Sequence, residues 1–160
     1  MSHPADAALA GLIGRRLHRL VRYEDGPLGL VLVNEGAGDQ PGFTYFQAMA
    51  AGWRLWAGDE LIDGSYHETE ANRITYADRL QGQTIDSITV APTADAWLTA
   101  GDLRLQVWSA AGAEPAMMWF RPGQETVIIG PGERWSHSVL DPEDPLHEVA
   151  TTAINLATHT

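Results

Sequence analysis

Short apolar or alternating runs, separated by turn signals, occupy most of the chain. Turns are marked by glycine, proline and aspartate at close intervals, as in Asp25-Gly26-Pro27, Gly101-Asp102 and Gly130-Pro131-Gly132. This spacing is typical of antiparallel strands in a β-sandwich or a partly open barrel. The pattern predicts a mainly β fold with strands at 17–23, 28–34, 43–49, 53–57, 84–90, 103–109, 117–121 and 126–129.

Two stretches share the pattern Leu-x-Gly-x-x-apolar-x-x-apolar, one starting at Leu12 and the other at Leu80. A strand alternating on leucine follows each copy, at 28–32 and at 103–107, and each half then reaches a tryptophan, Trp53 or Trp119. Because sequential strands usually pair, the pattern predicts two tandem repeats of about four antiparallel strands, spanning roughly 10–60 and 78–135.

The N-terminal residues fit two interpretations. Leu9, Leu12, Ile13, Leu17 and Leu20 also fit an apolar helical stripe flanked by arginines. The second copy of the repeat is β-branched and poorly suited to a helix, which favours a short helix over about 4–12 followed by a strand.

The C-terminal segment predicts an α-helix over about 145–157. Its apolar residues recur at helical spacing, and Asp144 before Pro145 supplies an N-cap and a first-turn proline. We expect this helix to pack on its own sheet, with assembly of a homo-oligomer through it as the alternative.

Composition and charge indicate one globular domain over 1–160. The 44% hydrophobic content lies outside the disordered range, while the formal charge of -11 and the absence of lysine and cysteine exclude several classes. Schiff-base, P-loop and thiolate chemistry are ruled out, and a nucleic-acid partner is disfavoured. With no membrane-spanning apolar run and no leader-like N-terminus, we expect a cytoplasmic protein with no membrane partner.

No pattern in the sequence indicates catalysis, a metal or a cofactor. The six histidines are scattered, and His67 has no ligand partner at a convergent spacing. There is no Gly-x-Ser-x-Gly nucleophile elbow. The Gly36-Ala37-Gly38 run is followed by a proline and a β-like segment, so it lacks the helix N-terminus that a dinucleotide needs. We expect no cofactor, and an enzyme is the less favoured interpretation.

Two features point instead to binding. One is an acidic stretch without arginine, which would steer a basic partner; the other is Trp108, which the strand phase places with Arg104 on the polar face. The speculative partner-binding residues are Asp59, Glu60, Asp63, Glu68, Glu70, Arg104 and Trp108. Trp53 and Trp56 are an odd number of residues apart, so they should point to opposite faces of one strand.

The repeat, with the small size and acidity of the chain, resembles small bacterial β-rich domains of unknown function, some of them immunity proteins of toxin systems. The resemblance covers roughly 10–135 and implies a non-enzymatic protein that neutralises or scaffolds another protein. We therefore expect an acidic protein-interaction module that occludes a basic partner surface. Two alternatives are a ligand-binding or enzymatic β-barrel with a pocket lined by Tyr45, Phe46 and Trp53, and a structural subunit that assembles through the C-terminal helix.

Overall fold

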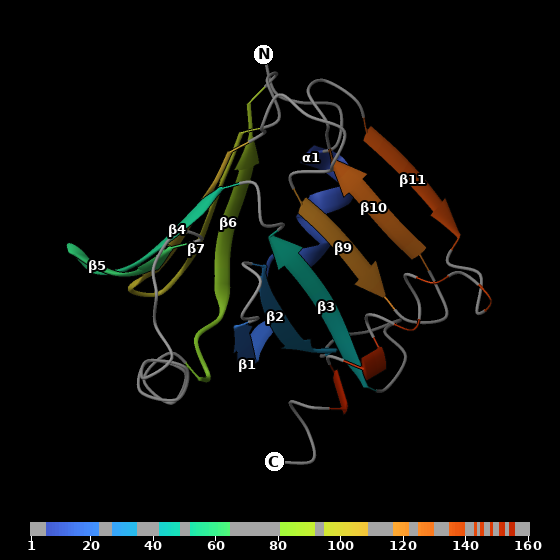
Figure 1. Ribbon diagram of the computed structural model, residues 1–160, viewed down its shortest axis with the longest axis horizontal. Coiled ribbons are helices and arrows are strands. Elements are labelled where there is room, and N and C mark those ends of the chain that lie inside the picture. Colours follow the sequence, from blue (N-terminus) through green and yellow to red (C-terminus); the bar gives the residue numbers. More distant parts are fainter. Residues whose placement is uncertain are drawn as a thin grey trace.

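The fold, seen in a computed structural model, consists of two antiparallel sheets that lie side by side as layers (Figure 1). The described residues are 6–22, 27–34, 42–48, 52–64, 81–91, 95–108, 117–121, 125–129 and 135–139, with the separate positions 143, 145, 148, 151, 152, 154 and 155. Within these residues the chain is mainly β, as the sequence predicted.

The six-stranded sheet, here sheet A, has the order β1-β2-β3-β9-β10-β11. Its strands are β1 (Arg16–Arg22), β2 (Leu28–Val33), β3 (Phe43–Ala48), β9 (Met117–Arg121), β10 (Glu125–Ile129) and β11 (Trp135–Val139). The five-stranded sheet, here sheet B, has the order β5-β4-β8-β7-β6. Its strands are β5 (Glu60–Gly64), β4 (Trp53–Ala57), β8 (Leu103–Val107), β7 (Ala96–Ala100) and β6 (Ile85–Val90).

All eight strands that the sequence predicted are present, and three further strands were missed. The missed strands are β5, β7 and β11. In β11 the run Trp-Ser-His-Ser-Val is largely polar, and β5 and β7 are each only five residues long, so none of the three stands out as an apolar run.

The N-terminal segment begins with a short helix, α1 (Asp6–Leu9), which continues as the 3-10 helix η1 (Ala10–Leu12). Leu9 and Leu12 are buried in the core. The Asp6 carboxylate accepts a hydrogen bond of 3.0 Å from the Val90 N–H, which ties the helix to β6. The residues after η1 form strand β1, so the short helix followed by a strand is the correct interpretation of this region.

The predicted C-terminal helix over 145–157 is wrong as a continuous element. Described positions there have helical backbone only at 145, 148, 151–152 and 154–155, and no helix in the described part of the chain reaches seven residues. The physical reason lies in the stripe itself: three of its six apolar residues are alanines, which bury little surface, and a helix this short is marginal without strong tertiary packing.

One hydrophobic cluster fills the space between the two sheets. It takes alternate residues from both, and the strongest alternation is in sheet B, where β4, β7 and β8 each bury their first, third and fifth residues. Leu55, Leu98 and Leu105 lie opposite one another on neighbouring strands and are at most 2% exposed. In sheet A, by contrast, β2 and β3 are buried on both faces.

The two sheets have corresponding connectivity. A three-stranded meander, β1-β2-β3, starts sheet A, and β9-β10 from the second half of the chain complete it; β6-β7-β8 start sheet B, and β4-β5 from the first half complete it. Each half therefore contributes three strands to one sheet and then crosses to the other. Sheet A has one additional strand, β11, at its edge (Figure 1).

The starts of β1 and β6 contact each other through a reciprocal set of backbone hydrogen bonds. The N–H of each glycine donates to the carbonyl of the residue three positions after the other glycine. The N–H of that residue in turn donates to the carbonyl of the residue directly after the first glycine. The bonds are Gly14 N to Ile85 O (2.9 Å), Gly82 N to Leu17 O (2.8 Å), Leu17 N to Gln83 O (2.7 Å) and Ile85 N to Arg15 O (2.9 Å). The two segments are thus related by a local two-fold arrangement.

The same two segments share further geometry. Gly14 and Gly82 both have φ of +88°, and the pairing of each strand shifts register at the equivalent place, between Leu17 and Arg19 in β1 and between Ile85 and Ser87 in β6. The alternating leucine strand β8, however, occupies the place of β3 rather than of β2, which corrects the predicted alignment of the halves. Repetition of the sequence over four strands stays a prediction.

Replacing Gly14 or Gly82 with alanine should destabilise the protein by about 1–2 kcal/mol each, because an L-residue is strained at positive φ. A Cβ at either position would meet no atom within 4 Å, so the cost comes from the backbone alone. The free energy of unfolding in urea measures it, with Gln81→Ala as the exposed neighbouring control. Effects that differ between the two glycines by more than about 1 kcal/mol would contradict their equivalence.

Candidate functional site

The acidic residues that were predicted to bind a partner do not all lie on the surface. Asp59 and Glu60 are exposed, in the turn from β4 to β5 and at the start of β5. Asp63 is fully buried, so its place in an acidic surface is wrong. Glu68 and Glu70 lie outside the described residues.

Asp63 pairs with Arg22 between the two sheets. The Arg22 Nε lies 3.1 Å from Asp63 Oδ2, and the two side chains are 7% and 0% exposed. The Arg22 Nη2 also donates to the Gly64 carbonyl at 3.2 Å, and Asp63 Oδ1 accepts from the Gly64 N–H at 2.7 Å. The guanidinium lies 5.0 Å from the centre of the buried Trp53 ring. A buried pair that joins an edge strand of each sheet is structural in character.

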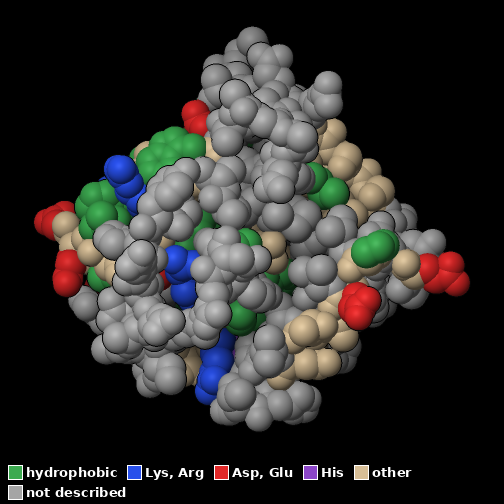
Figure 2. Space-filling view, in the orientation of Figure 1, with side chains coloured by type: hydrophobic (Ala, Val, Ile, Leu, Met, Phe, Trp, Pro, Cys, Tyr) green, Lys and Arg blue, Asp and Glu red, His purple; other side chains and the backbone are tan. Residues whose placement is uncertain are grey.

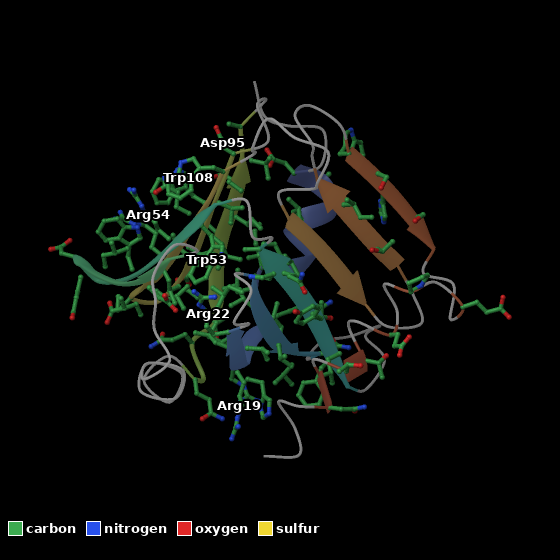
Figure 3. All side chains as sticks on the ribbon, in the orientation of Figure 1. Arg19, Arg22, Trp53, Arg54, Asp95 and Trp108 are labelled. Atoms are coloured by element: carbon green, nitrogen blue, oxygen red, sulfur yellow. The ribbon has the colours of Figure 1, made fainter. Side chains whose placement is uncertain are left out.

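The outer face of sheet B, which points away from sheet A, carries a different group of side chains. Figure 3 shows Arg54 and Trp108 projecting from this side, while Trp53 and Arg22 lie between the sheets. Trp108 and Arg104 therefore share the outer face, as the strand phase predicted. Trp53 is buried and Trp56 is half-buried on the other side of the strand, which confirms that they point to opposite faces.

Arginine and tryptophan alternate on this face across three strands. The Arg104 guanidinium lies between two rings, 5.5 Å from the centre of Trp56 and 5.3 Å from that of Trp97. The Arg54 guanidinium lies 4.9 Å from the centre of Trp108. At these distances the cations are attracted to the ring faces. We call this surface, made of Arg54, Trp56, Trp97, Arg104 and Trp108, the Trp–Arg face.

Sequence reasoning missed Arg54, Trp56 and Trp97 as members of this group. The available signal was phase: in β4 the outward positions are Arg54 and Trp56, and in β7 the outward position Trp97 stands between buried Ala96 and Leu98. Strand β7 was itself missed, so the phase of Trp97 could not be used. Leu61, opposite Trp56 on the edge strand β5, adds an exposed apolar side chain beside the face.

Neither arginine of the Trp–Arg face has a carboxylate partner in the part of the chain that the structure describes. The Nε1 of Trp56 is buried and has no hydrogen-bond partner among the described residues, so packing and Arg104 hold this ring in place. In the view of Figure 2, basic and hydrophobic side chains lie next to one another over sheet B. The face therefore combines apolar area with unneutralised positive charge.

The acidic residues that are exposed on sheet B gather at one end of it. The Gly58 N–H donates to the Asp102 carbonyl at 2.8 Å, so the β4–β5 and β7–β8 turns are adjacent. These turns carry the exposed residues Asp59 and Asp102, and Glu60 follows directly. Asp86, also exposed, accepts a hydrogen bond of 2.8 Å from the Gly101 N–H at this end. Sheet B thus has two arginines on its outer face and a negative end, and Asp86 and Asp102 are members that sequence reasoning missed.

The three aromatic residues that the sequence suggested for a pocket do not lie together. Phe46 and Trp53 belong to the hydrophobic cluster between the sheets. Tyr45 directly precedes Phe46 and points to the opposite face of β3, where its hydroxyl donates to Gln47 Oε1 at 2.6 Å and its ring lies against Gly29. A single pocket lined by all three is therefore excluded by the alternation of β3.

Two other functional features are absent from the described residues. They contain no group of three or more histidine, aspartate or glutamate side chains that could hold a metal ion. They also contain no helix with the length and apolar character required to cross a membrane.

Comparison with known proteins gives no family for this chain. No protein-family model matches it, and neither a curated protein nor a solved structure is significantly similar to it.

Proposed function

We propose that this protein is a non-enzymatic interaction module that binds another protein through the Trp–Arg face. The observation that carries the proposal is the gathering of three tryptophans and two arginines on the solvent side of one sheet. Tryptophan and arginine dominate the energetics of protein interfaces because they bury large areas and still make directed polar contacts.

The support of the Trp–Arg face by hydrogen-bonded strands suits such a role. The side chains stand on three hydrogen-bonded strands, and stacking with the rings restrains the long arginine side chains before a partner arrives. Less side-chain entropy is then lost on binding. The activity would be occlusion of a partner surface, as in an immunity-type protein, and no catalytic group is needed.

The charge distribution supports a partner with a basic margin. Asp59, Glu60 and Asp102 are exposed at one end of sheet B, and the whole chain carries a formal charge of -11. Charge of this sign increases the rate of association with a basic partner, most strongly at low salt. The basic region of the partner would lie opposite the acidic end of the sheet, beside the Trp–Arg face.

A matched pair of double variants tests the proposal. The face variant is Trp97→Ala with Arg104→Gln, and the control is Trp135→Ala with Arg16→Gln on sheet A. The control is well matched because Trp97 and Trp135 are 38% and 39% exposed. Proteins from the source cells that bind the immobilised wild-type chain are quantified by mass spectrometry and then purified for affinity measurements.

We expect at least one partner that binds the wild type and the control variant equally and binds the face variant at least about 30-fold more weakly, since a hot-spot residue contributes 2 kcal/mol or more. Equal binding by the face variant, or equal loss in the control, would refute the proposal.

Reversal of Asp59 and Glu60 to arginine should slow association of the partner, whereas Asp63 must be left unchanged because it is buried.

A further inference from the structure

The two arginines of the Trp–Arg face form no ion pair within the described part of a strongly acidic chain. Among the described residues neither Arg54 nor Arg104 forms an ion pair, although the chain has 21 acidic residues and only ten basic ones. Their interactions in the described part of the chain are with tryptophan rings. Within the described residues, their capacity to pair with an anion is therefore unused.

Stacking on a ring leaves the hydrogen-bonding groups of a guanidinium available. The ring contacts the flat face of the cation, whereas its N–H donors point outward in the plane and match the two oxygens of a carboxylate. The rings of Trp56 and Trp97 lie on the two strands that flank Arg104, with their centres 5.5 Å and 5.3 Å from its guanidinium. A cation restrained by two neighbouring rings should bind a carboxylate better than a freely moving surface arginine.

The register of the strands fixes the spacing of the two arginines. Arg54 lies directly opposite Gln106, and Arg104 is two residues from Gln106 along β8, so the arginines are diagonal neighbours on one face. Such neighbours lie roughly 7–8 Å apart, with their Cβ atoms somewhat closer.

The two arginine side chains also lean in the same direction along the strands. Arg54 reaches Trp108, which is two residues beyond its cross-strand partner Gln106. Arg104 reaches Trp97, which is two residues from its cross-strand partner Thr99 and faces Gln106. Because both side chains lean toward the same end of the sheet, we expect the charged groups to have a spacing close to that of the Cβ atoms.

An extended peptide repeats its side chains at nearly this distance. Residues i and i+2 of a strand point to one face and are about 6.6–6.8 Å apart. Resting on the proposed function, we propose that the segment of the partner that docks on the Trp–Arg face is an extended acidic peptide of the form Glu-x-Glu or Asp-x-Asp, with one carboxylate on Arg54 and the other on Arg104. The basic margin of the partner then faces Asp59, Glu60 and Asp102.

A nucleic acid has the wrong charge distribution for this surface. Its phosphates would extend beyond the two arginines toward the exposed acidic end of the sheet, and the chain as a whole repels a polyanion. A short acidic peptide places its charge only where the arginines are.

Binding of fluorescein-labelled peptides, measured by fluorescence anisotropy, tests the inference. The probe is Thr-Val-Glu-Val-Glu-Val-Thr, and the comparisons are the same peptide with glutamine in place of both glutamates, the same peptide with lysine in their place, and an octapeptide with the glutamates three residues apart. Single-stranded oligothymidine of eight nucleotides provides the nucleic-acid comparison.

We expect the Glu-x-Glu probe to bind at least about tenfold more tightly than the glutamine peptide. A hydrogen bond between charged groups contributes enough binding free energy for such a ratio of dissociation constants. Arg54→Gln or Arg104→Gln should reduce the ratio, and both together should abolish it. Trp97→Ala should weaken both peptides alike, and Trp135→Ala should change neither.

Equal binding of the glutamate and glutamine peptides, no binding of the glutamate probe, or tighter binding of the lysine peptide or of oligothymidine would overturn the inference. These outcomes are distinct from failure of the proposed function. A partner that still depends on Trp97 and Arg104 in the capture experiment would preserve the docking face and reject only the acidic peptide.

Discussion

Replacement of Asp63 by alanine should destabilise the protein by about 3–5 kcal/mol, because it leaves the Arg22 cation buried between the sheets without its partner. The two side chains are 0% and 7% exposed, so water cannot replace the lost carboxylate without disturbing the packing around Trp53. Arg22→Ala should cost a similar amount by orphaning the carboxylate. Chemical denaturation followed by tryptophan fluorescence measures both.

Two controls separate the buried pair from an ordinary charge effect. Asp59→Ala, in the exposed turn before β5, should change the unfolding free energy by no more than about 0.5 kcal/mol. The double variant Arg22→Met with Asp63→Leu should recover much of the loss, because it removes both charges together. A loss below about 1 kcal/mol for Asp63→Ala would show that this pair is solvated and does not join the sheets.

Replacement of Leu105 by alanine should cost about 2–5 kcal/mol, because it opens a cavity in the centre of sheet B. Leu105 is 0% exposed and lies between Leu55 and Leu98 on the neighbouring strands. The removed methyl groups leave both neighbours without contacts on one side, and the flanking strands restrain collapse of the site.

The matched control is the next residue along the same strand. Gln106 points to the outer face, so Gln106→Ala should change stability by at most about 0.5 kcal/mol. Similar losses for Leu105→Ala and Gln106→Ala in urea denaturation would contradict the assignment of inner and outer faces, and with it the Trp–Arg face.

Most of the β architecture could be predicted from the sequence because strand phase is a local property. The alternation in β8 placed Leu103, Leu105 and Val107 on the inside and assigned Arg104 to the outside, as found. What local patterns do not contain is the order of strands. The placement of β4 beside β8 and of β3 beside β9 joins segments from different halves of the chain, and no alternation pattern encodes those contacts.

Asp63 shows the same limit at a single residue. Along the chain it belongs to an acidic stretch with Asp59 and Glu60, and a local interpretation assigns it to the same surface. Its partner Arg22 lies 41 positions away, on the edge strand of the other sheet. Only the tertiary fold brings the two together, so burial of this carboxylate could not be predicted from its neighbours.

The sequence identified only part of the Trp–Arg face, for a related reason. Phase along β8 identified Arg104 and Trp108, but the face became a group only when β4 and β7 were placed on either side of β8. The alternation Ala-Trp-Leu-Thr-Ala in β7 is weakly apolar, which concealed the strand and its outward Trp97. Cross-strand pairing, and not composition, therefore makes the candidate site.

The separation of charge on sheet B would determine the orientation of a bound partner. Arg54 and Arg104 provide a positive centre without local acidic partners in the described residues, and Asp59 and Asp102 provide a negative end. A partner of complementary design has an acidic strand and a basic margin. This arrangement sets orientation as well as affinity, because a reversed partner would place like charges together.

The affinity of the captured partner for the face variant, Trp97→Ala with Arg104→Gln, is the decisive test of binding through the Trp–Arg face. Isothermal titration of the purified partner is carried out on the wild type, the face variant and the control variant, Trp135→Ala with Arg16→Gln. We expect a dissociation constant at least about 30-fold higher for the face variant and unchanged for the control. Equal dissociation constants for the wild type and the face variant would contradict it.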